Sequence, residues 1–421
     1  MRFLIVAQGS FGDLNPSMGI GLALKKRGHE VTFLTSGFYQ QALERLGLDL
    51  APTVSREDHL RITAHPDASH PFKSLRYVMR EWLVGPMRRE YAAIRDASQP
   101  GRTTVLMLGP GIGARIAQEK LGVPVITLLL YPQLLRSVYD PHGFGGGRLL
   151  PTMARKWIRA AFDRRIDAIV GPETNRFRNE LGLASIPRNF NDWAYSPELI
   201  VGLFPEWYAT PQPDWPPIRQ AGFPVFDGDP AAALAPEVEE FLVSGEPPVI
   251  VNALSGTRKA RGFFESSIAA LARLGRRGIL LSPYAENVPP NLPEGIRYFG
   301  YVPHTLLMPR VAAIVHQGGV GTMAKALLAG IPQIIVPVTY DQPYNGSHVT
   351  EMDAGAMIRP RNYDAGTVAR KLDSLLNSAA VKESLKQVQL KMRGEDGIGN
   401  TCHLIEAACD SRRAVAAGSA G

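Results

Sequence analysis

Short apolar runs alternate with amphipathic stretches along most of the chain, a pattern typical of a parallel sheet whose strands are joined by helices. The first apolar run, residues 2–7, is followed by a polar turn, a helix that Gly28 ends, and a second apolar run at 30–35. A strand, a helix and a parallel strand form a βαβ unit with a right-handed crossover. The pattern therefore predicts an α/β fold. Further elements of this series are expected at 104–108, 113–121, 123–129 and 199–204.

The same alternation begins again after a proline-rich stretch, residues 211–236, whose composition opposes regular helix or strand. We therefore expect two Rossmann-like parallel-sheet domains, residues 1–210 and 237–410, with terminal helices and a flexible tail at 411–421. Because open parallel sheets bind ligands at the carboxyl ends of their strands, we expect the two domains to face a cleft. The second series is expected at 249–254, 262–274, 278–282, 296–299, 313–316, 333–338, 365–377 and 381–392.

Composition narrows the class of protein. The chain has 421 residues, of which 45% are apolar and 20% charged, as in ordinary globular proteins. No apolar run reaches about 18 residues and no signal-peptide pattern precedes the first strand, so we expect a cytoplasmic location. Cys402 and Cys409 are expected to be isolated thiols. The net charge of +7 falls within residues 1–210, yet no nucleic-acid-binding module is recognised, so no nucleic-acid partner is expected.

A glycine-rich turn follows the apolar run at 313–316 and leads into an expected helix. Gly318, Gly319 and Gly321 allow a sharp turn and a close approach of a ligand, and Thr322 can cap the helix. Backbone N–H groups and the helix dipole at such a start favour a phosphate group. His316, at the end of the strand, could donate a further hydrogen bond to a phosphate oxygen. The turn is therefore a candidate diphosphate site, although such turns are also purely structural.

Three further groups follow the ends of expected strands in the second half. Asp341 and Gln342 form an acid–amide pair that can hold sugar hydroxyls. The hydroxyl and N–H groups of Ser255, Gly256 and Thr257 could contact phosphate. Tyr301 and Val302 could present an aromatic face and backbone groups to a nucleobase, although Tyr301 could equally pack in the core.

In the first half, the turn after the first strand contains Ser10, Phe11, Gly12 and Asp13. Asp13 precedes the expected helix, where an acid is favoured for capping alone. The functional alternative is a carboxylate that removes a proton from an acceptor hydroxyl. The Asp-Gly-Asp sequence at 227–229 imitates a metal-binding motif of sugar transferases, but it lies in the expected linker, so we expect no metal site.

Five segments together resemble the family 1 glycosyltransferases of the GT-B fold, and the similarity extends over nearly the whole chain. These segments are residues 9–13, 27–29, 316–322, 330–333 and 341–345. Further similarity to the rhamnosyltransferases of mono-rhamnolipid synthesis lies at 204–208, 214–216 and 222–228.

By this resemblance, His316 and the turn to Thr322 hold the donor diphosphate, Asp341 and Gln342 hold the donor sugar, and Asp13 is the base. Many relatives have His at the position of Asp13. The implied reaction is an inverting, metal-independent hexosyl transfer without a cofactor, from a dTDP- or UDP-linked sugar. The sugar would be L-rhamnose from dTDP-rhamnose, and the acceptor a lipid-like hydroxyl such as that of a hydroxyalkanoyloxyalkanoate.

Three alternatives stay open at this point. One is a UDP-glucose-dependent glucosyltransferase acting on a sterol or an aromatic natural product. The others are a nucleotide-sugar epimerase and a non-catalytic sugar-nucleotide binder. An epimerase needs no acceptor, so the turn at Asp13 favours a transferase.

Two basic amphipathic segments, residues 72–91 and 148–165, allow two interpretations. The second carries six basic residues and one acid among apolar side chains that include Trp157. Such a helix can lie on an anionic membrane or bury its apolar face in a core. We expect core packing, with an apolar groove suited to an acyl chain. Peripheral contact with the inner membrane is the alternative, and no partner protein is evident.

Overall fold

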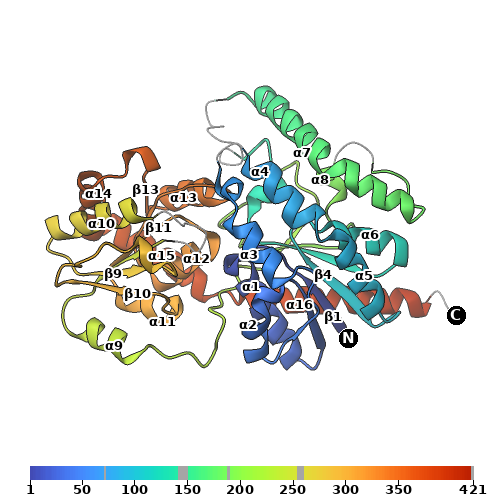
Figure 1. The fold of residues 1–421 in the computed structure, drawn as a ribbon, viewed down its shortest axis with the longest axis horizontal. Helices are drawn as coiled ribbons and strands as arrows, with labels where there is room; N and C mark the ends of the chain where they lie inside the picture. The colour runs from blue at the N-terminus through green and yellow to red at the C-terminus, as the bar shows by residue number, and fades with distance from the viewer. Residues whose placement is uncertain (71–72, 141–149, 187–189, 254–259, 419–421) are drawn as a thin grey trace. The chain divides into compact units, whose positions relative to one another are not determined.

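The computed structural model describes residues 1–70, 73–140, 150–186, 190–253 and 260–418. It divides the chain into two compact units (Figure 1). The first comprises Met1–Gly228 together with Asp396–Gly421, and the second comprises Asp229–Glu395. Each unit is a parallel sheet with helices on both faces, so the predicted fold class is confirmed.

The described residues of the first unit form a seven-stranded sheet in the order β3-β2-β1-β4-β5-β6-β7, in which every pairing is parallel. The central strand β1 is apolar at each position after Arg2, because both faces of the sheet are covered. The strands are β1 (Arg2–Val6), β2 (Glu30–Leu34), β3 (Asp49–Leu50), β4 (Thr103–Leu108), β5 (Val125–Leu129), β6 (Ile200–Gly202) and β7 (Arg219–Gln220).

Successive side chains of β1 enter opposite cores, as strand geometry requires. Phe3 and Ile5 pack against α1 and α16, whereas Leu4 and Val6 pack against α5, α6 and α7. The helices of this unit are α1 (Phe11–Lys26), α2 (Gln40–Arg45), α3 (Arg56–Ala64), α4 (Ser74–Val78), α5 (Met87–Ala97), α6 (Ile112–Leu121), α7 (Thr152–Glu180), α8 (Phe190–Trp193) and α16 (Gly397–Gly418).

The described residues of the second unit form a six-stranded parallel sheet in the order β10-β9-β8-β11-β12-β13. Val249 and Val251 of β8 enter one core and Ile250 the other. The strands are β8 (Val249–Asn252), β9 (Gly278–Leu281), β10 (Ile296–Phe299), β11 (Ala313–His316), β12 (Gln333–Ile335) and β13 (Gly355–Met357). The helices are α9 (Pro236–Val243), α10 (Arg261–Arg273), α11 (His304–Leu307), α12 (Val320–Ala329), α13 (Gln342–Glu351), α14 (Ala365–Asn377) and α15 (Ala379–Arg393).

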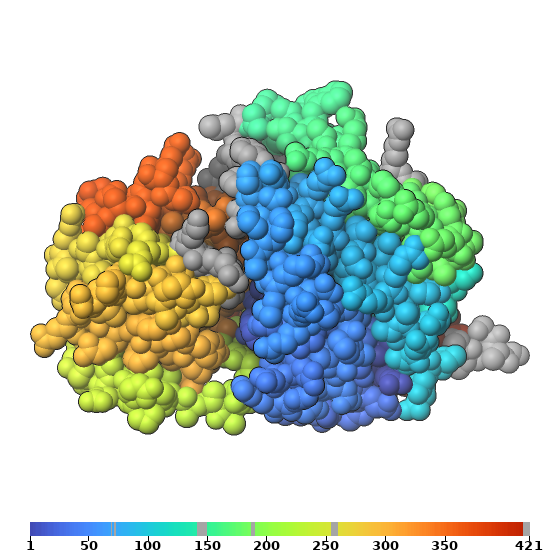
Figure 2. Space-filling model, viewed as in Figure 1, coloured from blue at the N-terminus to red at the C-terminus, as the bar shows by residue number. Residues whose placement is uncertain are grey.

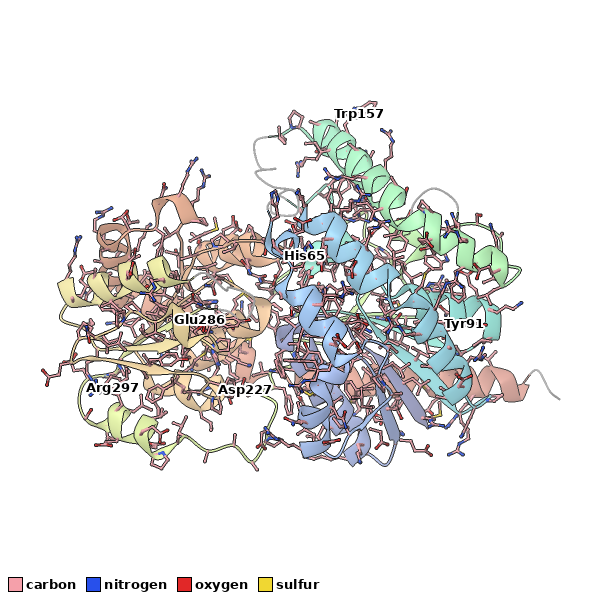
Figure 3. All side chains as sticks on the ribbon, viewed as in Figure 1. His65, Tyr91, Trp157, Asp227, Glu286 and Arg297 are labelled. Carbon is pink, nitrogen blue, oxygen red and sulfur yellow. The ribbon has the colours of Figure 1, made fainter. Side chains whose placement is uncertain are left out.

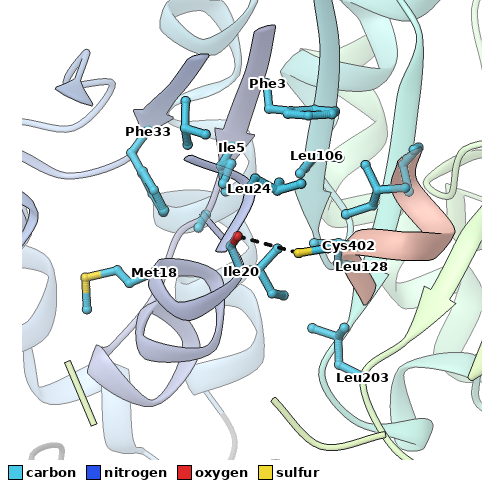
Figure 4. Close-up of a cluster of buried hydrophobic side chains, with 14 of the residues drawn as sticks. Phe3, Ile5, Met18, Ile20, Leu24, Phe33, Leu106, Leu128, Leu203 and Cys402 are labelled. Atoms are coloured by element: carbon cyan, nitrogen blue, oxygen red, sulfur yellow. Dashed lines mark hydrogen bonds between the residues drawn. The ribbon is translucent and has the colours of Figure 1, made fainter. Parts of the chain in front are cut away.

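The C-terminal helix α16 returns to the first unit, whereas we expected residues 237–410 to form one domain and 411–421 a flexible tail. Cys402, Ile405 and Cys409 of α16 are buried in the core that α1 and the first sheet share (Figure 4). Both cysteines are free thiols, as predicted. Cys402 Sγ lies 3.9 Å from Ile20 O of α1, Cys409 Sγ lies 3.5 Å from Thr104 Oγ1 of β4, and the helix continues to Gly418.

The expected linker at 211–236 also differs from the structure. Residues 219–220 pair with β6 as the edge strand β7, and Pro236 begins α9. β7 itself contains no proline, and Pro236 is tolerated in the first turn of α9 because the backbone N–H groups there have no partner within the helix. The division between the units lies at Gly228 and Asp229.

The two basic amphipathic segments behave differently. Met79, Leu83 and Val84 pack against the core of the first unit, as expected for residues 72–91. In α7, however, Met153 and Trp157 are 64% and 68% exposed, so the expected core packing of 148–165 is wrong for the start of this helix.

Candidate active site

Both candidate turns lie where the strand order of their sheet reverses. In the first sheet, β1 and β4 are neighbours, and the chain leaves them toward opposite edges. In the second sheet, the corresponding neighbours are β8 and β11. Ligands of open α/β sheets bind at such switch points, outside the carboxyl ends of the strands. The turn after β1 and the turn after β11 therefore occupy the expected ligand-binding position of each unit.

In the first unit, Asp13 is part of a capping box. Its Oδ2 atom accepts hydrogen bonds from Ser10 N at 2.8 Å and Ser10 Oγ at 2.9 Å, while Gly12 N donates to Ser10 Oγ at 3.2 Å. These contacts start α1 at Phe11, several residues before the position that the sequence predicted. Asp13 is thus a helix cap, and the capping uses one carboxylate oxygen. Within the described residues, no hydrogen bond from another residue ends on Oδ1.

The surroundings of Asp13 favour its protonated form more than those of an ordinary carboxyl group. Burial raises the pKa of Asp13, and the hydrogen bonds from Ser10 oppose this shift. Gly9 has a φ of 124°, and a Cβ placed there would lie 2.5 Å from Asp13 Oδ2, so the turn needs glycine at this position. A carboxyl with a raised pKa is a better proton acceptor when ionised.

Aromatic rings surround the Asp13 turn. Phe11 is 39% exposed and lies 4.9 Å from Tyr39 and 6.1 Å from Phe38, measured between ring centroids. Phe38 stacks on His59 at 4.4 Å, and the Tyr39 hydroxyl donates to Gly9 O at 2.6 Å. The carboxylate therefore stands beside an apolar aromatic wall.

In the second unit, the turn between β11 and α12 requires glycine at one position and leaves space at another. Gly318 has a φ of 96°, and a Cβ there would lie 2.5 Å from Ile335 Cγ2. Gly319 is the N-cap residue of α12, and Thr322 N bonds Gly319 O at 3.1 Å. Thr322 is therefore inside the helix rather than its cap. A Cβ on Gly321 would meet no heavy atom within 4 Å, so the helix start has open space there.

His316 has a different position from the one predicted for a phosphate ligand. Its side chain is 0% exposed. Gly318 N donates to Nδ1 at 3.0 Å, so the proton resides on Nε2, which lies 3.0 Å from Gln333 Oε1. Burial lowers the pKa of His316 to about 4, which keeps the ring neutral. Both nitrogens are in use, so we correct the prediction: His316 holds the shape of the turn and does not present a donor to phosphate.

Replacing His316 should therefore act mainly on stability. His316→Ala leaves Gly318 N and Gln333 Oε1 without their partners, and each orphaned buried group costs roughly 1–3 kcal/mol of folding free energy. We expect a clear fall in the free energy of unfolding, measured by urea titration. A variant of unchanged stability with weakened nucleoside diphosphate binding would restore the direct role of His316.

Asp341 connects the start of α12 to α13. Its Oδ2 atom accepts from Val320 N at 3.1 Å and from Asn345 Nδ2 at 2.7 Å, and Asn345 Nδ2 also reaches Gly318 O at 2.8 Å. A carboxylate at a helix N-terminus is favoured by the helix dipole. The structure thus brings Asp341 and the glycine turn together, as the sequence predicted.

Gln342 supports the neighbouring loop. Its Oε1 atom accepts from Val338 N at 2.7 Å and from Thr339 N at 3.0 Å. No hydrogen bond among the described residues uses its NH₂ group. Gln342 can therefore keep the loop in place and still donate to a ligand oxygen.

The remaining predicted residues have mixed outcomes. Tyr301 is 63% exposed, which removes core packing as its role, whereas the Val302 side chain is buried in the core beneath α11 and α12. Only the backbone of Val302 could therefore contact a nucleobase. Ser255, Gly256 and Thr257 lie outside the described residues, so their predicted contact with phosphate remains a prediction.

Three residues of this region were not predicted as site residues. Gln333 and Asn345 hold His316 and Asp341, as described above. Asn252, at the end of β8, lies 2.9 Å from His304 Nε2 through its side-chain nitrogen. The signal that could have found Asn252 and Gln333 is a polar residue within an otherwise apolar strand, because such a residue must find a buried partner.

The Asp-Gly-Asp sequence has a local role. Asp229 Oδ1 accepts from Ala231 N at 2.8 Å, and Gly228 has a φ of 86°, so the segment forms a turn between the units (Asp227 is labelled in Figure 3). In the part of the chain that the structure describes, no group of three or more His, Cys, Asp or Glu side chains is arranged to hold a metal ion.

The sequence is similar to those of known glycosyltransferases. Residues 278–396 match the family model of the erythromycin biosynthesis protein CIII-like C-terminal domain. The O-mycaminosyltylonolide 6-deoxyallosyltransferase of Streptomyces fradiae is 26% identical, over 98% of both chains. Glycosyltransferase GtfE of Amycolatopsis orientalis is 28% identical, over 84% of this chain and 85% of its own. Sterol 3-beta-glucosyltransferase of Pichia angusta is 25% identical, over 96% of this chain and 33% of its own.

Solved structures agree on the fold. The glycosyltransferase of kitacinnamycin has a TM-score of 0.75 at 19% identity, over 97% of this chain and 98% of its own. VinC, solved with dTDP, has a TM-score of 0.73 at 20% identity, over 98% of this chain and all of its own. The spinosyn rhamnosyltransferase SpnG has a TM-score of 0.67 at 16% identity, over 97% and 99%. The fold is therefore GT-B. Together with the sequence matches, it makes this chain a glycosyltransferase.

Proposed function

We propose that the chain transfers a hexosyl group from a nucleoside diphosphate sugar to the hydroxyl of a lipid-like acceptor, with inversion and without a metal. The observation that carries this proposal is the placement of Asp13 and of the Gly318–Thr322 turn at the switch points of their two sheets. One position offers a carboxylate with a raised pKa, and the other offers a helix start with open space beside Gly321.

In the proposed reaction, Asp13 Oδ1 removes the proton of the acceptor hydroxyl, since Oδ2 is held by Ser10. The acceptor oxygen attacks the anomeric carbon from the face opposite the nucleotide, forming the new glycosidic bond as the bond to the diphosphate breaks. One base and no covalent intermediate give inversion. The leaving diphosphate gains negative charge, which the start of α12 stabilises through its N–H groups and dipole.

The donor sugar would contact the groups between α12 and α13. Asp341 can accept from sugar hydroxyls, and the NH₂ group of Gln342 can donate to them. Tyr301, being exposed, can cover the nucleobase. We propose L-rhamnose and a dTDP donor within this class, with the dTDP complex of VinC as support for the nucleotide.

The aromatic wall beside Asp13 supports an apolar acceptor. Phe11 and its partly exposed neighbour Phe38 can contact an acyl chain or a ring system while the hydroxyl lies at the carboxylate, and buried Tyr39 supports Phe11 from below. A hydroxyalkanoyloxyalkanoate fits this description. The sterol glucosyltransferase relative favours a second candidate, glucosyl transfer from UDP-glucose to a sterol. A screen of dTDP-rhamnose and UDP-glucose against hydroxy-fatty-acid dimers and sterols separates the two.

The variant Gly321→Ala tests whether the Gly318–Thr322 turn binds the donor diphosphate. Its methyl group would enter the open space in which we place the diphosphate, while alanine favours a helix more than glycine does. We expect unchanged or slightly higher thermal stability, and dTDP affinity that falls about tenfold or more, equivalent to ~1.4 kcal/mol. Isothermal titration calorimetry and thermal melting measure the two effects.

Gly171→Ala in α7 is the matched control, because that glycine is also helical and also has no heavy atom within 4 Å of a built Cβ. It should leave dTDP affinity unchanged. If Gly321→Ala binds dTDP and UDP as tightly as the wild type does, the diphosphate does not lie over this helix start.

A further inference from the structure

The first turns of α7 expose apolar side chains and turn charged side chains inward, the opposite of an ordinary surface helix. Trp157 and Met153 are one turn apart on the outer side, 68% and 64% exposed, and Ile158 beside them is 43% exposed. α7 lies at the surface of the first unit (Figure 2), and Trp157 is labelled near the start of this helix (Figure 3). An ordinary surface helix buries such residues.

The charged side chains of the same turns face inward. Arg159 Nη1 lies 2.9 Å from Asp214 Oδ2, and Arg136 Nη1 lies 2.7 Å from Asp163 Oδ1. The Nε and Nη1 atoms of Arg155 are also buried. The inward side therefore holds an ion-pair cluster of the first unit, which leaves the apolar residues on the outside. From Phe162 onward the helix packs apolar residues on the core in the ordinary way.

The exposed charges beside these apolar residues are basic. Lys156 is exposed next to Trp157, and Arg164 and Arg165 follow two turns later on the same side. Asp163 is the one acid of α7 in this stretch, and its side chain is only 16% exposed because it pairs inward. Among the described residues, no acidic side chain forms an ion pair with Lys156, Arg164 or Arg165, so the outer surface of 153–165 combines apolar side chains with positive charge.

We propose that this surface, which comprises Met153, Trp157, Ile158, Lys156, Arg164 and Arg165, binds the surface of an anionic lipid bilayer. Apolar side chains enter the interfacial region, tryptophan favours that depth, and the basic side chains contact lipid phosphates. A stable protein interface engages about 20–30 residues on each side, far more than this surface offers. None of the described helices is both long and apolar enough to span a bilayer, so the contact is peripheral.

The test is cosedimentation of the full chain with vesicles, one set of phosphatidylglycerol and phosphatidylethanolamine and one of phosphatidylcholine. We expect binding to the anionic set that weakens at high salt. The variant Met153→Ser/Trp157→Ser should lower the partition coefficient about tenfold or more, and Lys156→Glu/Arg164→Glu should lower it similarly. Leu390→Ser, which alters an exposed apolar residue of α15, is the matched control and should bind as the wild type does.

Tryptophan fluorescence gives a second readout. The chain has five tryptophans, so the variant Trp157→Phe is needed to assign the signal to Trp157. The wild type should show a blue-shifted emission and quenching by brominated lipids, and this component should be lost in Trp157→Phe although the variant still binds. The proposal would be overturned if the wild type and the double variants bound anionic vesicles equally, or if the wild type did not bind them. It would also be overturned if the wild type formed a dimer that the Trp157 variants abolish, because the surface would then be a protein interface. Vesicle binding is measured without substrate, so its outcome is independent of the proposed reaction.

Discussion

Asp13→Asn should abolish most turnover while the protein stays folded and still binds its donor. A positioned base typically contributes 10²–10⁴-fold to the rate, and asparagine cannot accept the proton. The asparagine oxygen can still accept the hydrogen bonds from Ser10 that begin α1, so thermal stability should change little. Initial rates with the natural acceptor, dTDP titration and thermal melting together provide the measurement.

The pH profile adds a check that a merely structural role would not affect. Because burial raises the pKa of Asp13 above its ordinary value of 3.8, this carboxylate takes up its proton at a higher pH than an ordinary aspartate does. Turnover of the wild type should therefore fall as the pH decreases through this raised pKa, and the residual turnover of Asp13→Asn should lack that acid limb.

Asp364→Asn is the matched control, since Asp364 also caps a helix, α14, through Gly366 N and Thr367 N. It should keep full turnover. Asp13→Asn with wild-type turnover would reduce Asp13 to a helix cap, and another base would have to act.

Asp341→Ala should lower turnover of the donor sugar without weakening the binding of free dTDP. Loss of one hydrogen bond to a charged group costs roughly 1.5–3 kcal/mol, so kcat/KM should fall about 10- to 150-fold if Asp341 holds a sugar hydroxyl. Affinity for free dTDP should not fall, because the variant frees Val320 N and removes a negative charge from the start of α12. Steady-state kinetics and calorimetry measure the two quantities.

Asp341→Asn keeps an oxygen that can accept from Val320 N but removes the charge, so it should lie between the wild type and Asp341→Ala in turnover. Equal losses of turnover and dTDP affinity in Asp341→Ala, together with a lower melting temperature, would mean that Asp341 only holds the turn through Val320 and Asn345.

The strand and helix pattern was predictable because its causes are local. β10 at Ile296–Phe299 and α14 at Ala365–Asn377 have the predicted bounds. In β10, buried Ile296 alternates with exposed Arg297, as in a strand at the edge of a sheet, and Asp364 supplies the cap that starts α14. The start of α1 was missed because the Ser10–Asp13 capping box was interpreted as a turn.

The roles of individual site residues were harder to predict. Gly318 could be inferred as a turn residue, but the partner of His316 is Gln333, seventeen positions away along the chain and adjacent only through the pairing of β11 with β12. A histidine at the end of a strand has the same sequence signature whether it meets a ligand or a buried amide.

The sequence by itself determined two parallel α/β units, the glycosyltransferase resemblance, and the two turns that carry Asp13 and Gly318–Thr322, because apolar periodicity and glycine-rich turns are properties of neighbouring residues. Only the tertiary structure decided which unit α16 joins, that His316 is buried and neutral, and that Trp157 faces outward. Each of these depends on contacts between distant segments: Cys402 with α1, His316 with Gln333, and Arg159 with Asp214. Burial and charge pairing at such contacts are fixed only when the chain folds.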